Sequence, residues 1–131
     1  MSRSEPLPPL SEAELGIMNV VWDRGEATVA EVWGSLRASR GVARNTVLTQ
    51  MDRLVEKGWL LRDSGGHAHR YRASVLREAT LGSLVRRLVD TAFQGSAEGL
   101  VLALLHGRGV SSQEAERIRA MIDEAEEGRV P

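Results

Sequence analysis

The sequence predicts a mainly α fold, a winged helix-turn-helix followed by a C-terminal helical region. Three segments with helical periodicity precede a hairpin centred on two glycines, and three more helical segments follow it. Helix–helix–helix–hairpin is the plan of a winged helix, and a short turn between the second and third helices places the third on the surface. We expect a flexible lead over residues 1–9, a winged-helix domain over 10–74 and a helical domain over 75–131.

The first two helices are predicted from capping boxes, in which a Ser or Thr side chain and a Glu three residues later satisfy each other's backbone N–H groups. Ser11 with Glu14 starts a helix that runs to about residue 22, and Thr28 with Glu31 starts the second. Both segments carry apolar residues at helical spacing. The tryptophans are expected in the core, at Trp22, Trp33 and Trp59.

The third helix is predicted to run from about Ala43 to Lys57. Gly58 follows it at the position where a left-handed glycine ends many helices. The next stretch, "WLLRDSGGHAHRYRAS", has two short strand-like runs on either side of Gly65 and Gly66. Glycines between such runs indicate a β-hairpin, the wing of the predicted fold.

After the hairpin, apolar residues repeat at helical spacing in three segments, separated by "QGS" and "HGRG". In the first segment they cover more than one side of the helix, and the two short helices after it can bury only part of that surface. We therefore expect a second copy of the chain to cover the rest and the 75–131 region to be a dimerisation domain. The residues expected in this contact are Leu81, Leu84, Val85, Leu88, Val89, Phe93, Val101, Leu104, Leu105, Ile118, Met121 and Ile122.

Composition limits the function classes. The 131 residues include no Cys, which excludes disulfides, thiolate metal sites and Cys nucleophiles. No apolar run approaches the roughly 20 residues of a membrane span, and "MSRSEPLPP" lacks the apolar core of a signal peptide. We expect a cytoplasmic protein without membrane insertion.

Charge is distributed unevenly along the chain. The net charge is −1, but residues 37–72 carry 8 Lys and Arg against 3 acidic residues, a net +5. Residues 1–36 are net −4 and residues 73–131 are net −2. A polyanion responds to a local basic patch rather than to the overall charge, and this patch contains the third helix and the wing.

The third helix has a polar side opposite its apolar side. On a helical wheel of about 100° per residue, Val47, Met51, Leu54 and Val55 gather on the core side. The opposite side carries small hydrogen-bonding groups and one guanidinium, from Asn45, Thr46, Thr49 and Arg53. Such side chains suit the DNA major groove, where Arg bonds guanine, Asn bonds adenine and the Thr methyl touches thymine. An ordinary solvated face is the alternative, favoured by Asp52 and Glu56 on its flanks.

The wing favours the DNA-binding interpretation. Basic groups on a hairpin beside a recognition helix suit contact with phosphates, and Arg62 and His69 add to this cluster. Among the basic side chains, the expected phosphate contacts are Arg44, Lys57, His67, Arg70 and Arg72. Tyr71 is expected to pack under the wing, with base stacking as a minor alternative.

His67 and His69 offer a second interpretation of the wing. Alternate residues of a strand share a face, so the pair could contribute to a metal site. No Cys and no nearby acidic cluster completes the ligand shell. We therefore predict neither a metal nor a cofactor.

The chain resembles the penicillinase-repressor (BlaI/MecI) family of winged-helix regulators. The stretches "AELGIMNVVW", "TVAEV", "NTVLTQMDRLVEKGWL" and "HRY" carry the resemblance, which covers residues 10–127. The most specific matches are Ala13, Glu14, Met18, Trp22, Thr46, Thr49, Arg53, Leu54, Lys57, Gly58, Val101 and Leu102. The resemblance implies a homodimeric repressor on a dyad operator, with the third helix on the bases and the C-terminal helices forming the dimer.

Three departures from the family pattern concern specificity and induction. Asn45 replaces the Lys common at that position, so the preferred operator is expected to differ. Antibiotic-sensing members are cut at an Asn-Phe pair downstream of a membrane sensor, where this chain has Ala103-Leu104. Copper-sensing relatives hold Cu(I) on cysteines, which this chain lacks. An upstream sensor or a protease of different specificity stays a candidate partner, and so does release without cutting.

An enzyme and a protein-contact module are the two other function classes. No Ser/His/Asp set, phosphate-binding glycine loop or paired carboxylates stands out, so we predict that the protein is not an enzyme. A winged helix used only for protein–protein contact is the stronger alternative. The net +5 segment argues against it, and salt-dependent binding to random duplex DNA would discriminate the two.

Overall fold

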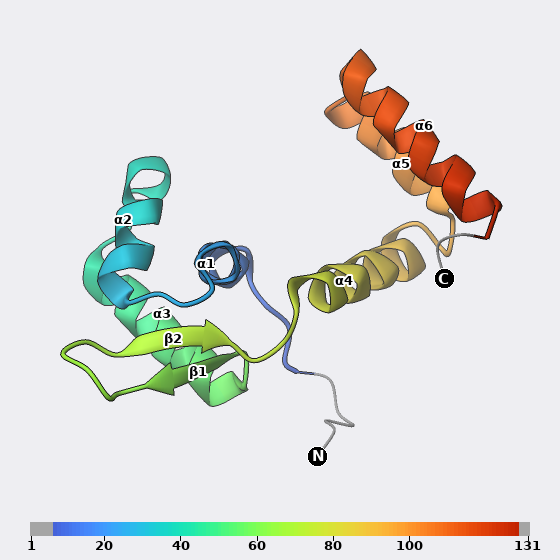
Figure 1. Cartoon of the computed structure of the whole chain (residues 1–131). Helices are drawn as coiled ribbons and strands as arrows, with labels where there is room; N and C mark the ends of the chain where they lie inside the picture. Colours follow the sequence, from blue (N-terminus) through green and yellow to red (C-terminus); the bar gives the residue numbers. More distant parts are fainter. Residues whose placement is uncertain (1–6, 129–131) are drawn as a thin grey trace. The chain divides into compact units, whose positions relative to one another are not determined.

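The computed structural model describes residues 7–128, which contain six helices and one two-stranded antiparallel hairpin. In chain order these are α1 (Glu12–Arg24), α2 (Val29–Arg40), α3 (Arg44–Lys57), β1 (Leu60–Asp63), β2 (Arg70–Ala73), α4 (Arg77–Ala92), α5 (Ala97–Gly107) and α6 (Ser112–Glu126) (Figure 1). The predicted fold class is confirmed. The chain divides into two compact units, of which the first ends at Gly82 and the second begins at Ser83. The division falls inside α4, eight residues after the domain boundary expected from the sequence.

The predicted helix boundaries follow from local chemistry. Both capping boxes form: Ser11 and Glu14 exchange hydrogen bonds of 2.9 and 3.1 Å, and Thr28 and Glu31 exchange bonds of 3.0 and 3.1 Å. α3 ends at Gly58, whose φ of 93° is the left-handed conformation that favours glycine.

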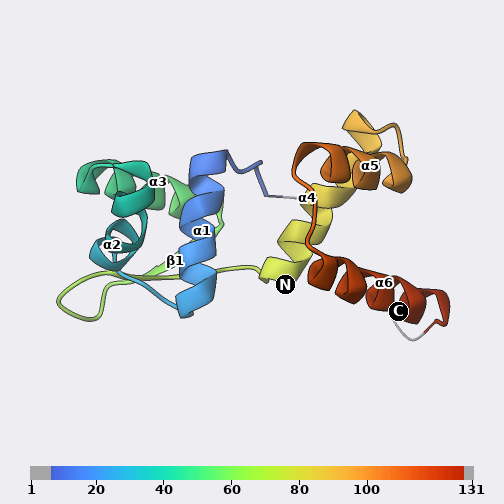
Figure 2. The same ribbon diagram turned by 90° about the horizontal axis from the view of Figure 1, so that it is seen from above.

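One core holds the first unit together. α1 packs against α2, α3 and β2, and the hairpin projects to one side of the three helices (Figures 1 and 2). The buried apolar side chains come from these elements and the segments between them: Ile17, Met18, Val21, Ala27, Val32, Leu36, Val47, Met51, Leu54, Trp59, Leu60 and Tyr71.

The tryptophans border this core, and each indole N–H has a backbone acceptor. Trp59 is buried, whereas Trp22 and Trp33 are half-buried and pack against the core. Each indole Nε1–H donates to a backbone carbonyl over 2.8–3.0 Å: Trp22 to Val75, Trp33 to Val42 and Trp59 to Pro8.

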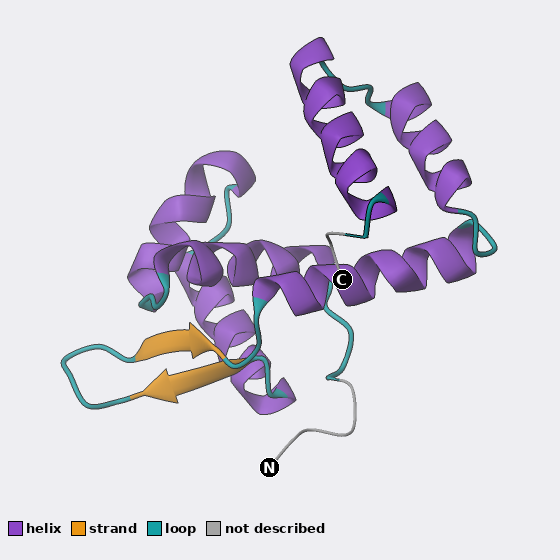
Figure 3. Ribbon diagram, turned by 45° about the vertical axis from the view of Figure 1, so that its right-hand side comes forward, coloured by secondary structure: helices purple, strands orange, loops and turns teal. Residues whose placement is uncertain are grey.

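The hairpin forms with a longer turn than its glycines suggested. Residue 63 pairs with 70 and residue 60 with 73, so six residues, 64–69, connect the strands (Figure 3). Neither glycine adopts a positive φ. Instead, the Gly65 N–H donates to the Asp63 carboxylate at 3.0 Å, an Asx-type turn. His67 and His69 therefore lie in the loop, not on a strand.

Ala27 joins the wing to the segment between α1 and α2. Its N–H and C=O exchange hydrogen bonds of 2.9 and 2.8 Å with those of Tyr71, on the edge of β2 opposite β1. These two backbone hydrogen bonds hold the wing close to the start of α2.

The second unit has a different character, because no residue of its described part, 83–128, is buried. Its large exposed apolar side chains are Leu84, Val85, Leu88, Val101, Leu102, Leu104, Leu105, Met121 and Ile122. Val89, Phe93 and Ile118 are half-buried. No single described helix is both long and apolar enough to cross a membrane; α4 and α5 meet that test only as a pair bent by 95°.

Candidate nucleic-acid interface

The exposed side of α3 carries the four residues predicted to read bases. Asn45, Thr46, Thr49 and Arg53 are all exposed, whereas Val47, Met51 and Leu54 on the other side have no exposed surface. The two sides separate because the apolar residues recur every three to four positions and pack on α1 and α2. The polar side of α3 is thus not covered by any described residue and is accessible to a partner.

These side chains differ in how far they are already engaged. The described residues provide no hydrogen bond or ion pair to the side chains of Asn45, Thr46 or Arg53, so their polar groups are available. The Thr49 hydroxyl donates to the Asn45 carbonyl at 3.0 Å. Its methyl group and a hydroxyl lone pair remain available for a partner.

Leu48 also lies on this surface, although it is not among the residues predicted from the sequence. Its exposed fraction is 39%, whereas neighbouring Val47 is fully buried. The helical wheel contained the signal, because Leu48 lies about 100° from Val47, at the margin of the apolar side. A leucine there offers an apolar contact at the edge of the recognition surface.

A groove of about 450 Å³ separates the start of α3 from the wing loop. Its basic side chains are Arg44, His67 and His69, and none of them has a hydrogen bond or ion pair within residues 7–128. Its remaining lining comes from Thr28, Val29, Ala30, Asn45, Leu48, Ala68 and Tyr71. The lining therefore combines apolar side chains with three basic ones and contains no carboxylate.

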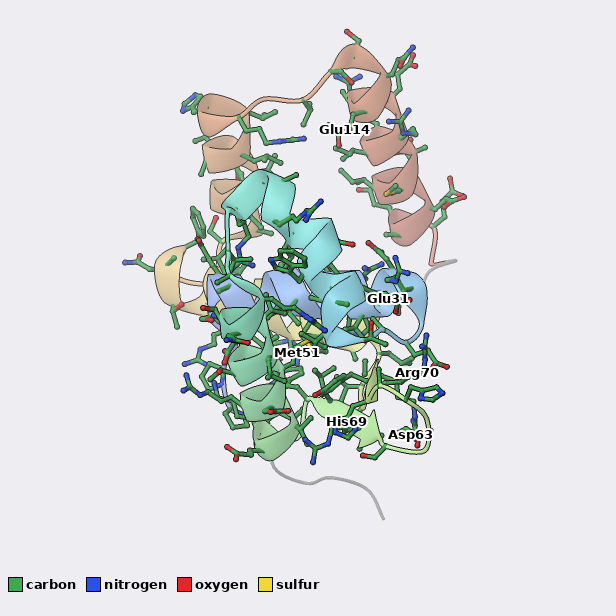
Figure 4. The ribbon with its side chains drawn as sticks, turned by 90° about the vertical axis from the view of Figure 1, so that its left-hand side faces the viewer. Glu31, Met51, Asp63, His69, Arg70 and Glu114 are labelled. Carbon is green, nitrogen blue, oxygen red and sulfur yellow. The ribbon has the colours of Figure 1, made fainter. Side chains whose placement is uncertain are left out.

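Arg70 has partners in the protein. It forms an ion pair with Glu26 and lies 3.7 Å from the Glu31 carboxylate (Figure 4). The hydrogen bond from Arg70 to Glu26 and the nearby carboxylates raise the pKa of the Arg70 guanidinium, which stays charged. Arg70 does not pair with Asp63, although the two residues are opposite each other in the register of the hairpin.

Lys57, another predicted phosphate contact, has an ion-pair partner within the protein. Its Nζ lies 2.8 Å from Oε2 of Glu14, whose side chain is only 7% exposed. Burial raises the pKa of the Glu14 carboxyl, but hydrogen bonds from Lys57 and Ser11 together outweigh it, so the net pKa lies below its usual value. The Lys57 ammonium therefore joins the end of α3 to α1 instead of pointing freely toward a phosphate.

Asp52 joins α3 to the wing. Its Oδ1 accepts hydrogen bonds from the Tyr71 hydroxyl at 3.0 Å and from Arg62 at 3.2 Å. Burial, followed by the bond to Asp52, raises the pKa of Tyr71, so the phenol stays protonated and donating. Tyr71 packs under the wing as predicted, and Asp52 is a structural acceptor between the two elements.

The remaining predicted contact, Arg72, is exposed and has no ion pair among the described side chains. Within residues 7–128, no group of three or more His, Cys, Asp or Glu side chains is placed to hold a metal ion.

A three-helix unit with a hairpin wing and an exposed polar third helix defines the class of winged-helix proteins. The chain belongs to the penicillinase repressor family, whose family model matches residues 10–124.

Individual relatives agree with this assignment. The transcriptional regulator BlaI of Mycobacterium tuberculosis is 34% identical over 125 residues, which are 93% of this chain and 88% of the relative. The penicillinase repressor of Bacillus licheniformis is 23% identical over 90% of this chain and 92% of its own.

Among solved structures, the monomeric form of Bacillus licheniformis BlaI in complex with the blaP half-operator superposes with a TM-score of 0.50 and 27% identity. The match covers 56% of this chain and 89% of the BlaI chain. The matched part of BlaI is thus similar to about half of the present chain.

Proposed function

We propose that this protein is a DNA-binding transcriptional repressor that acts as a homodimer on a dyad operator. The observation that carries the proposal is the exposed, largely unpartnered polar side of α3 beside a basic groove and wing. Membership of the penicillinase repressor family supports the same role, which is not an enzymatic one. The proposal includes a cytoplasmic location, because a repressor must share a compartment with its operator.

The base-reading residues of the proposal are Asn45, Thr46, Thr49 and Arg53. The phosphate contacts are Arg44, His67 and Arg72, which have no internal partner, together with Arg70. Arg70 can exchange partners, because the ion pair of two exposed side chains, here Arg70 and Glu26, contributes little to stability. Lys57 is not included, because moving its ammonium to a phosphate would leave the nearly buried carboxylate of Glu14 without its ion-pair partner.

The dimer is proposed to form through the second unit. Its described part exposes nine large apolar side chains and buries none. Exposed apolar surface of this extent marks a protein contact, and a second copy of the same unit is the partner that a dyad operator requires. Val89, Phe93 and Ile118 are half-buried within one chain and would be covered further in the dimer.

The release signal has two candidate routes. Ala103 and Leu104 lie within α5, so cutting between them requires local opening of the helix. In the first route, an upstream sensor activates a protease of different specificity, which cuts this helix after it opens. In the second, the intact repressor is released from DNA. The mass of the protein in its native host during induction of the target gene separates the routes, because cutting yields a fragment that ends at Ala103.

The experiment that tests the repressor role is a selection of binding sites from random duplex DNA with the full chain, followed by binding measurements at several salt concentrations. We expect an enriched dyad sequence and a log affinity that falls linearly with log salt. The competing function, a winged helix for protein contact alone, predicts neither enrichment nor salt-dependent binding.

A further inference from the structure

The groove between α3 and the wing loop contains two of the three histidines of the chain, and the proposed function uses only one of them. His67 and His69 come from the loop, and Arg44 comes from the first turn of α3. Figure 4 shows His69 on the wing beside α3. Two elements far apart in sequence thus bring three basic side chains to one hollow.

We propose that this groove binds the sugar–phosphate backbone of DNA and that its two histidines make the affinity for the operator dependent on pH. The inference rests on the proposed DNA binding and adds a regulated subsite to it.

Charge complementarity selects the occupant. The lining can carry up to three positive charges, on Arg44, His67 and His69, and contains no carboxylate. The apolar part of the lining, which includes Val29, Ala30 and Leu48, suits the carbon atoms of a deoxyribose. A backbone phosphate with its sugar has this combination of an anionic group and an apolar one.

The surrounding acids are already engaged. Glu31 of α2 accepts from the Thr28 N–H and pairs with Arg24 and Arg70. Glu26, in the segment before α2, pairs with Arg70 as well. Asp63 of the wing accepts from the Gly65 N–H.

Within residues 7–128 neither histidine has a hydrogen bond or an ion pair, and Arg44, the other charged residue of the groove lining, is positive. A DNA phosphate would thus supply an anionic partner that no described protein group supplies to the two imidazoles.

Protonation then couples to binding. Imidazole changes charge between about pH 5 and 8, and only imidazolium can neutralise a phosphate. An opposite charge within about 4–6 Å raises the pKa of a cationic group by about one unit or more. By linkage, each histidine that contacts phosphate therefore strengthens binding about tenfold between pH 8 and pH 5.5, and two strengthen it about a hundredfold.

The test measures operator affinity of the full chain by fluorescence anisotropy between pH 5.5 and 8.5, at several salt concentrations. Three variants are compared with the wild type: His67→Gln, His69→Gln and the double variant. His106→Gln is the matched control, because His106 lies in α5, outside the groove. Circular dichroism at each pH checks that all proteins keep the same helix content.

We expect the wild type and His106→Gln to gain affinity on acidification, each single variant to lose part of the gain and the double variant to lose all of it. The slope of log affinity against log salt should be steeper at pH 5.5 than at pH 8.5 by about 0.9 per contacting histidine, and this difference should vanish in the double variant.

Three results would overturn the inference while leaving the proposed function intact: salt-dependent operator binding with no pH effect, a pH effect that survives in the double variant, or one that His106→Gln removes. Absence of salt-dependent DNA binding at every pH would instead refute the proposed function itself.

Discussion

Arg53 is the exposed guanidinium in the second half of α3, and no described residue pairs with it. We expect Arg53→Ala to change the preferred sequence as well as to weaken binding, because one bidentate base contact is worth about 1–3 kcal/mol of discrimination. Binding-site selection with the variant measures this effect. Arg117→Ala in α6 removes the same charge outside the first unit and should keep the wild-type consensus. An unchanged consensus in Arg53→Ala would assign Arg53 to phosphate contact or to structure.

Substitutions of Arg70 and Glu26 test whether Glu26 and a DNA phosphate compete for the Arg70 guanidinium. We expect Arg70→Ala to weaken binding to all sequences alike and to lower the salt slope by about 0.9, the value for one phosphate. Glu26→Gln removes the competing carboxylate and should strengthen binding. If Arg70 only holds the wing, Arg70→Ala leaves the slope unchanged and Glu26→Gln gives no gain; equilibrium binding at four or five salt concentrations separates the two cases.

Lys57 is predicted to stabilise the fold rather than to bind DNA. Lys57→Met should lower the free energy of unfolding at pH 7 by about 1–3 kcal/mol, because it removes a partner of a nearly buried carboxylate, and should leave the salt slope of DNA binding unchanged. The pKa of Glu14 is lower in the folded protein than the ordinary value of 4.5. The contribution of the pair is therefore present above about pH 4.5 and is lost as the pH falls through the lower folded pKa.

Urea unfolding of wild type and Lys57→Met at pH 7 and near pH 3 measures this difference. We expect the two proteins to differ at pH 7 and the difference to shrink at the lower pH, because the contribution of the pair is lost as the pH falls toward and through the lowered pKa of Glu14. A variant as stable as the wild type at pH 7, with a salt slope lower by about 0.9, would return Lys57 to the phosphate contacts.

At the scale of elements, α1 and α2 start at capping boxes, but α3 does not. Its N-cap residue, Ala43, provides no side-chain hydrogen bond to the first turn. Ala43→Ser supplies the missing acceptor and should stabilise the protein by about 1 kcal/mol. Thermal unfolding measures the gain, with Ala43→Gly as a control that offers no side-chain acceptor. A variant with Ser no more stable than the one with Gly would mean that the first turn of α3 cannot use a cap.

The same elements show what the sequence could predict. Capping boxes, Gly58 and the apolar spacing are local signals, so the positions of α1, α2 and α3 followed from them. The exposed sides of α3 were likewise predictable, because a helix of known register has a fixed geometry. The partners of Lys57 and Arg70 were not, because Glu14 and Glu26 are 43 and 44 residues away in sequence. Such pairs depend on how elements pack, which no local pattern encodes.

At the scale of the whole molecule, the two units bury their apolar residues differently. Every buried apolar residue in the described chain comes from positions 17–71, whereas the described part of the second unit has none. The first unit thus has a core of its own. The second unit exposes apolar side chains that a second copy is proposed to cover, so its stability should depend on protein concentration.

Charge substitutions in the second unit test that dependence in the full chain. Leu88 and Leu104 are 45% and 38% exposed on α4 and α5. We expect Leu88→Glu and Leu104→Glu to yield monomers in ultracentrifugation at micromolar concentration, because a carboxylate in an apolar contact must be desolvated without a partner. Leu76→Glu is the control, since Leu76 is 73% exposed, lies in the first unit and is not among the expected contacts; it should remain dimeric.

DNA binding gives the second readout of the same variants. In a dimer, binding of one half-site raises the effective concentration of the other subunit at its half-site, which strengthens binding by about 10²–10⁴ over a single half-site. The monomeric variants should lose this gain on a dyad operator and keep the wild-type affinity for an isolated half-site, since the first unit is unchanged. A wild-type chain that is monomeric at micromolar concentration, or that binds dyad and half-site DNA equally well, would remove the homodimer from the proposed function while leaving the contacts of α3 and the wing in place.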